Sequence, residues 1–112
     1  MIPEMKYFKI TAIIRNGQLE PVEARLREIQ VKGVSVTPVK GFGAYANFFD
    51  PGWLSSHSRI EIFLSEPDVE PTVNAILETA HTGNPGDGIV AVLPVETVYR
   101  IRTRKVAQPG EI

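Results

Sequence analysis

The chain has 112 residues, of which 43% are apolar and 22% charged, and we expect residues 1–112 to form one globular domain. Its net charge of −1 leaves no basic footprint for general nucleic-acid binding, and the lack of cysteine excludes a disulfide framework or a thiolate metal site. No apolar run approaches the roughly 20 residues that span a bilayer, and charges begin at residue 4, so we expect neither membrane insertion nor a signal peptide but a cytoplasmic protein.

The first part of the chain predicts a strand, a helix and a second strand. Residues 6–15 are rich in β-branched and aromatic side chains, and their alternation turns one set to a common face: Phe8, Ile10, Ala12 and Ile14. After the turn signal Asn16-Gly17, apolar residues recur at helical spacing over residues 19–29. Gly33 suits the end of this helix, and residues 34–39 predict the second strand.

The second part repeats this order with a strand first. Residues 59–64 alternate and point Ile60, Ile62 and Leu64 inward. Residues 66–79 predict a helix that Ser65 or Asp68 caps, with an apolar stripe of Val69, Val73, Ile76 and Leu77. Residues 89–102 form the last strand region, interrupted near Pro94. The resulting order, β-α-β-β-α-β, is an α+β ferredoxin-like fold with both helices on one face of the sheet, and the apolar opposite face predicts oligomerisation.

Two segments lack periodicity. Residues 43–58 form a loop that contains Phe48, Phe49 and Trp53. Loops of this length are usually either functional or disordered. These aromatic side chains either fold back on the protein or anchor a partner, since exposed aromatics favour interfaces. Residues 105–112 include Pro-Gly and are expected to form a flexible tail.

The stretch from residue 86 to residue 102 combines a glycine turn with two arginines. In Gly86-Asp87-Gly88 the missing Cβ atoms let backbone N–H groups approach an anion. Arg100 and Arg102 are two residues apart, so both guanidinium groups lie on one face of an extended strand. Together these groups suit a polyphosphate. The alternative, which this stretch alone favours, is a hairpin turn followed by an edge strand kept soluble by charge.

The chain as a whole resembles the PII signal-transduction family. The resemblance runs from about Tyr7 to Arg104 and depends on the order and spacing of short segments: 10–15, 33–43, 60–62, 79–83, 86–88 and 99–103. It implies a homotrimer of ferredoxin-like subunits that is not an enzyme and binds adenine nucleotide (ADP, AMP or ATP) between subunits. It also identifies residues 43–58 as a short form of the family's T-loop, which contacts a membrane transporter or a metabolic enzyme.

The resemblance implies a role for individual residues of the nucleotide site. Gly41 and residues 86–88 would surround the phosphates, which Arg100 and Arg102 would also bind. The neighbouring subunit would line the adenine with Gly33, Val34 and Ser35. In the third strand, Glu61 matches the family's acidic residue and Phe63 the apolar position that follows.

Departures from the family pattern affect the choice of ligand. Ile89 and Asn84 stand where the family usually has lysine, and Ala44 and Tyr45 replace an arginine and a glutamine. A charge-assisted hydrogen bond contributes about 1.5–3 kcal/mol, so fewer of them should weaken binding of a γ-phosphate most. We therefore expect ADP or AMP to bind at least as well as ATP.

A second small anion is a further expectation. Lys40 and Arg59 flank the loop and are either solvated charges or, with Arg100, an anion pocket. Short-loop relatives of PII proteins are associated with inorganic carbon, so bicarbonate is the anion that the resemblance suggests. The alternatives are an ordinary nitrogen-regulatory PII protein that senses ATP and 2-oxoglutarate, and a trimeric metal-binding protein of similar fold. The sequence offers neither a nucleophile–base pair nor a set of metal ligands beyond His57 and His81, so no catalytic cofactor is expected.

Overall fold

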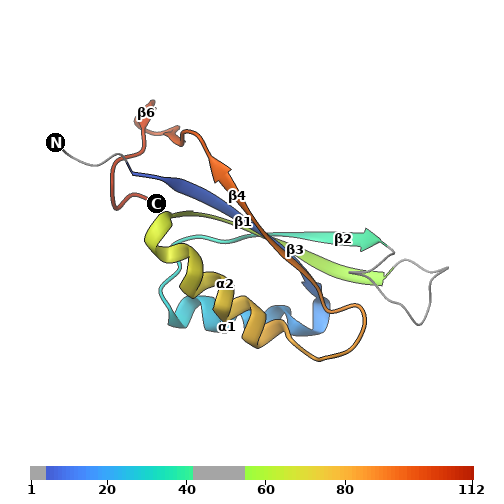
Figure 1. Cartoon of the computed structure of the whole chain (residues 1–112). Helices are drawn as coiled ribbons and strands as arrows, with labels where there is room; N and C mark the ends of the chain where they lie inside the picture. The colour runs from blue at the N-terminus through green and yellow to red at the C-terminus, as the bar shows by residue number, and fades with distance from the viewer. Residues whose placement is uncertain (1–4, 42–54) are drawn as a thin grey trace.

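The computed structural model describes residues 5–41 and 55–112. The elements run β1 (Tyr7–Arg15), a 3₁₀ turn η1 (Asn16–Gln18), α1 (Leu19–Glu28), β2 (Ser35–Gly41), β3 (Ser55–Ser65), α2 (Glu66–Ala80), β4 (Gly88–Val95), β5 (Tyr99–Arg100) and β6 (Lys105–Val106). The first four strands form an antiparallel sheet in the order β2-β3-β1-β4, and α1 and α2 lie side by side on one of its faces (Figure 1). This confirms the predicted α+β ferredoxin-like β-α-β-β-α-β fold.

The core lies between the helices and the sheet. Strand alternation buries the predicted side chains of β1 and β3 except Phe8, which is only partly buried. The others are at most 5% exposed: Ile10, Ala12, Ile14, Ile60, Ile62 and Leu64. Val22 and Leu26 of α1 and Ile76 and Ala80 of α2 also belong to this cluster. Leu77 was predicted to join it but is 53% exposed. It lies one position beyond Ile76, about 100° around the helix, and therefore faces away from the sheet.

Both edge strands of this sheet contain a proline. Pro38 lies in β2 and Pro94 in β4, where the missing N–H costs least because an edge strand has a neighbour on one side only. β4 runs through Pro94 to Val95, and the interruption that we predicted near Pro94 follows at residues 96–98, before β5. Ser65 takes the N-cap position of α2 as expected, although its side chain makes no capping hydrogen bond within the described residues.

The outer face of the sheet lies opposite the helices, and neither described helix covers it (Figure 1). Its residues alternate with the buried ones, and several of them are large and apolar. Phe63, Ile89 and Leu93 are 43–49% exposed. Exposed apolar side chains of this kind favour association with another protein surface, in line with the predicted oligomerisation.

Two predicted segments have different boundaries in the structure. β3 begins at Ser55, so the end of the predicted loop 43–58 is strand. Phe48, Phe49 and Trp53, together with Ala44 and Tyr45, lie outside the described residues. The C-terminal segment makes ordered contacts, among them a hydrogen bond from Tyr7 Oη to the Ala107 carbonyl oxygen (3.2 Å). The tail therefore contacts the body of the protein, and its flexibility in solution stays a prediction. No helix in the described ranges is long and apolar enough to cross a membrane.

Candidate functional site

The residues predicted to bind the phosphates lie at the two ends of the sheet in one chain. The Gly86–Gly88 loop lies where β1 ends and β4 begins, since Gly88 pairs with Ile14. Arg100 follows β4 at the opposite end of the sheet (Figure 1). The eight residues of β4 separate these two groups by about 25 Å, at roughly 3.3 Å per residue. A single chain therefore does not bring the loop and the arginines to one phosphate chain. This differs from our expectation that only Gly33, Val34 and Ser35 come from the neighbouring subunit.

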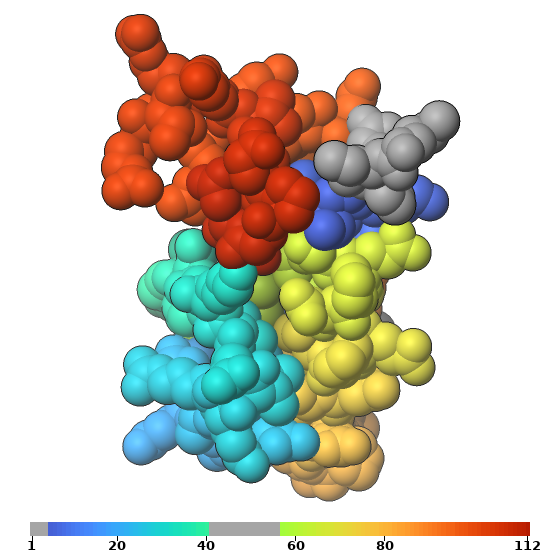
Figure 2. Space-filling model, turned by 90° about the vertical axis from the view of Figure 1, so that its left-hand side faces the viewer, coloured from blue at the N-terminus to red at the C-terminus, as the bar shows by residue number. Residues whose placement is uncertain are grey.

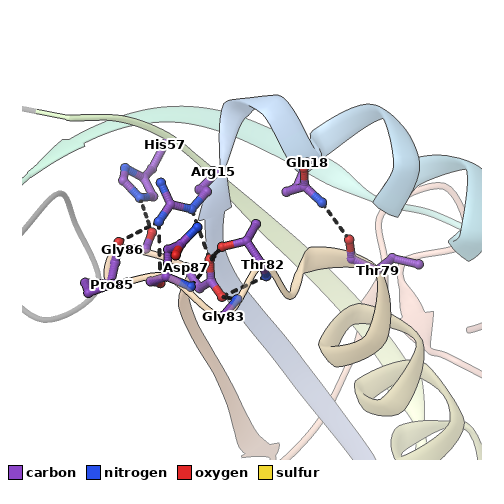
Figure 3. Close-up of polar contacts among 10 residues, drawn as sticks. Arg15, Gln18, His57, Thr79, Thr82, Gly83, Pro85, Gly86 and Asp87 are labelled. Atoms are coloured by element: carbon purple, nitrogen blue, oxygen red, sulfur yellow. Dashed lines mark hydrogen bonds and ion pairs between the residues drawn. The ribbon is translucent and has the colours of Figure 1, made fainter.

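Asp87 organises the glycine loop (Figure 3). Its carboxylate accepts hydrogen bonds from the Thr82 hydroxyl, from the N–H groups of Thr82 and Gly83 (both 2.9 Å) and from Arg15 Nε (3.0 Å). The hydrogen bond from the Thr82 hydroxyl, supported by the other donors, holds the pKa of Asp87 well below its ordinary value. The carboxylate is thus ionised, and both of its oxygens accept hydrogen bonds from within the protein. In this structure it therefore holds the shape of the loop.

Arg15 and His57 fasten this loop to the sheet. Arg15 Nη2 donates to the Pro85 carbonyl oxygen (2.5 Å), and the ring Nε2 of His57 lies 2.9 Å from the Gly86 carbonyl oxygen. The two residues face each other across β1 and β3, and His57 is 4% exposed. His57, which the sequence presented as a loop residue, is therefore a buried strand residue that connects the start of β3 to the glycine loop (Figure 3).

The fold itself requires the second glycine of the motif. Gly86 and Gly88 adopt φ angles of 97° and 109°, in the region that side chains disfavour. A Cβ atom on Gly88 would lie 1.7 Å from the Ile13 carbonyl oxygen. This supports part of the turn interpretation, because the close approach of β4 to β1 accounts for Gly88 without any ligand.

The two arginines do not share a strand face. β5 ends at Arg100, and the N–H of Arg104 donates to the Arg100 carbonyl oxygen (2.8 Å), which closes a turn. Arg102 therefore lies in an exposed turn between β5 and β6, and the prediction that both guanidinium groups project from one extended face is wrong. Arg100 Nε lies 3.3 Å from a carboxylate oxygen of Glu111.

Glu61 and Phe63 lie on the outer face of the sheet. Glu61 forms ion pairs with Lys9 and Arg59, both at 3.0 Å, and the hydrogen bond from Lys9 is the main cause that lowers the pKa of Glu61. Lys9 Nζ also lies 5.8 Å from the centre of the Phe63 ring. Ser35 faces Glu61 across β2 and β3.

The expected anion pocket does not form within one chain. Arg59 shares the outer face with Glu61, whereas Lys40 has the parity of Val36, which pairs with buried Ile60 on the helix face. Arg100 lies at the far end of the sheet. Lys40, Arg59 and Arg100 thus point to different regions.

Gly33 and Val34 line an open groove beside the end of α1, together with Leu26 and Val31. A Cβ atom on Gly33 would meet nothing within 4 Å among the described residues. Gly41, the last residue of β2, pairs with Ser55.

The sequence alone did not predict the role of Arg15, because only the sheet register brings it to a loop about 70 residues away. No group of three or more metal-ligating side chains occurs in residues 5–41 and 55–112.

Comparisons with known proteins give a consistent result. A family model described as nitrogen regulatory protein P-II matches residues 7–105. The chain is 36% identical over 118 residues to a P-II homolog of Arabidopsis thaliana, and these span 98% of the chain and 60% of the relative. It is 39% identical over 107 residues to P-II of Azospirillum brasilense, with 85% and 91% covered. The chain thus spans less than two thirds of the plant relative.

The structural comparison agrees. A crystal structure of Arabidopsis thaliana PII bound to citrate matches with a TM-score of 0.78 and 34% identity, covering 96% of this chain and 92% of the other. The relatives named here refer to nitrogen regulation, and none of these names supports the link to inorganic carbon.

Proposed function

The chain belongs to the nitrogen regulatory P-II family, and we propose that it binds an adenine nucleotide between the subunits of a homotrimer and signals through residues 43–58. Proteins of this family are signal transducers and not enzymes; they bind adenine nucleotides and effectors and regulate target proteins. P-II proteins work in the cytoplasm or in plastids, and we propose the cytoplasm for this chain. The target would be a membrane transporter or a metabolic enzyme.

The observation that carries this proposal is the separation of the two halves of the site. The glycine loop and Gly41 lie at one end of the sheet and Arg100 and Arg102 at the other. One nucleotide can contact both halves only if two copies of the chain contribute. The uncovered apolar outer face provides a surface on which such copies would pack.

The same geometry changes the assignment of the adenine contacts. Lys32 Nζ donates to the Gly110 carbonyl oxygen and Arg100 pairs with Glu111, so the tail connects the Gly33 region to Arg100. We therefore assign Gly33, Val34 and Ser35, with Glu61 and Phe63, to the subunit that supplies the arginines. Residues 86–88 and Gly41 would come from its neighbour.

Calorimetry of ADP binding tests the arginines. Arg100→Ala and Arg102→Ala should each weaken binding by roughly tenfold or more, because each removes a charge-assisted contact to phosphate. Lys105→Ala is the matched control, since it removes one charge from the same hairpin and should leave binding unchanged. Unchanged affinity in the double arginine variant would contradict the assignment.

Mixed oligomers test the shared site. Neither the double arginine variant nor Asp87→Ala, which disrupts the glycine loop, should bind ADP well alone. When the two are refolded together, some interfaces pair an intact loop with intact arginines, and part of the binding should return. Absence of this recovery, in oligomers that light scattering shows to be mixed, would contradict a site between copies. A monomer mass at micromolar concentration would contradict the trimer itself.

The effector that acts together with the nucleotide is either 2-oxoglutarate or bicarbonate. The relatives favour a nitrogen-sensing protein that responds to ATP and 2-oxoglutarate, and the Arabidopsis PII structure contains citrate, also a carboxylate. The pocket expected for bicarbonate does not form in one chain. The replacements Ala44, Tyr45, Asn84 and Ile89 still remove donors that would serve a γ-phosphate and a dicarboxylate. Calorimetry with ADP, AMP and ATP, each with 2-oxoglutarate or bicarbonate, distinguishes the two effectors. Mutual enhancement of Mg-ATP and 2-oxoglutarate establishes the first, and enhancement of ADP by bicarbonate the second.

A further inference from the structure

The segment Ala107–Ile112 folds back against the body of the protein. Ala107 is 4% exposed, and its N–H donates to the Val98 carbonyl oxygen (2.8 Å). Ile112 helps to line a hollow beside the end of α1, β3 and the beginning of α2, together with Val31, Ile62 and Pro71. Figure 2 shows the end of the chain, in red, lying against the teal segment that follows α1. Phe63 lines the same hollow, and Lys32, next to Gly33, donates to the Gly110 carbonyl oxygen, so the tail lies beside residues that we assign to nucleotide.

Within this tail, the carboxylate of Glu111 forms an ion pair with the guanidinium group of Arg100. One carboxylate oxygen lies 3.3 Å from Arg100 Nε, and Nη1 donates to the Glu111 carbonyl oxygen (3.4 Å). The other carboxylate oxygen accepts the N–H of Gln108 (2.7 Å), while the N–H of Glu111 donates to the Gln108 carbonyl oxygen (3.0 Å). A small turn thus orients the carboxylate toward the guanidinium group.

A phosphate group requires the same donors. A guanidinium group binds a phosphate most strongly through two parallel N–H groups on one edge. The Nε–H belongs to such an edge, and here Nε faces the Glu111 carboxylate while Nη1 donates to the Glu111 carbonyl oxygen. We infer that Glu111 is a built-in competitor for the anion that Arg100 binds, so that a bound nucleotide displaces the tail. This inference rests on the proposed function, because it takes Arg100 to be a phosphate ligand.

The contact is suited to a weak, reversible competition. The side chains of Arg100 and Glu111 are 37% and 30% exposed, so water screens the pair. Ion pairs of this kind are weak, and removing the competing charge should tighten ADP binding by roughly two- to fivefold. Displacement should also leave the turn between Gln108 and Glu111 without its contact to Arg100, so the N–H groups of this turn should exchange with solvent faster.

The variant Glu111→Gln tests the inference with little change in shape, because its amide oxygen still accepts the Gln108 N–H. We expect tighter ADP binding by calorimetry and faster hydrogen exchange of residues 107–112 without ligand. In the unchanged protein, ADP should accelerate exchange of the same residues. Glu20→Gln is the matched control, because it removes an equal charge from an exposed position at the start of α1.

The outcomes separate this inference from the proposed function. Weaker ADP binding by Glu111→Gln would show that Glu111 supports the ligand, and it would overturn the competition. An unchanged tail and unchanged affinity would also overturn it, while ADP binding by the unchanged protein still supports the nucleotide site. If neither protein binds ADP although the substitution loosens the tail, the nucleotide proposal is refuted and the competition with it.

Discussion

The substitution Asp87→Asn removes the charge around which the glycine loop is built. The asparagine oxygen can still accept the N–H groups of Thr82 and Gly83, but its amide group then faces two donors, Arg15 Nε and the Thr82 hydroxyl. Hydrogen bonds to a charged group contribute about 1.5–3 kcal/mol each. Because the side chains of Asp87 and Arg15 are 24% and 31% exposed, water partly compensates. We expect a loss of about 1–3 kcal/mol in the free energy of unfolding at pH 7.

The effect should depend on pH in one direction. The pKa of Asp87 is lowered in the folded state, chiefly by the Thr82 hydroxyl, so the unfolded chain binds a proton more readily. The stability that this carboxylate contributes is fully present above its unfolded pKa of about 3.9 and is lost as the pH falls below that value. Asparagine does not titrate. The difference between the two proteins should therefore shrink below about pH 4.

Urea unfolding followed by circular dichroism at pH 7 and pH 3 measures this difference, at one protein concentration because association affects stability. Asp68→Asn is a suitable control, since Asp68 is exposed in the first turn of α2 and should contribute less than about 1 kcal/mol. An equal loss at both pH values, or no loss at pH 7, would refute the role given to the ionised carboxylate.

Urea unfolding also checks three further expectations. Gly88→Ala should cost more than about 3 kcal/mol, because its Cβ atom would collide with the Ile13 carbonyl oxygen, whereas Gly33→Ala, with nothing near its Cβ among the described residues, should change stability by less than about 1 kcal/mol. Ile76→Ala should cost about 2–5 kcal/mol and Leu77→Ala far less, because only Ile76 is buried; equal losses would contradict the orientation of α2. His57→Ala should cost about 1–3 kcal/mol, because it leaves the Gly86 carbonyl oxygen without its ring partner. A His57→Ala protein as stable as the unchanged one would contradict this contact.

The sequence by itself determined the types, order and buried faces of the elements. The alternation of Ile10, Ala12 and Ile14 and of Ile60, Ile62 and Leu64 matches the burial in the structure. Periodicity is a local property, because the angle between successive side chains depends only on the backbone of that element. The short segments that resemble P-II proteins also occur at fixed places in this order, so the family could be recognised from the chain alone.

Tertiary structure alone decided which polar groups meet. The register of β1 with β3 and β4 brings Arg15 to His57 and to the Asp87 loop, although these residues are far apart in the chain. The length of β4 separates that loop from Arg100, and the return of the tail places Glu111 on Arg100. A side chain such as Arg15 or Glu111 looks like any exposed charge in the sequence. Its partner depends on strand pairing and chain reversal, which sum many weak, long-range contacts that no local pattern records.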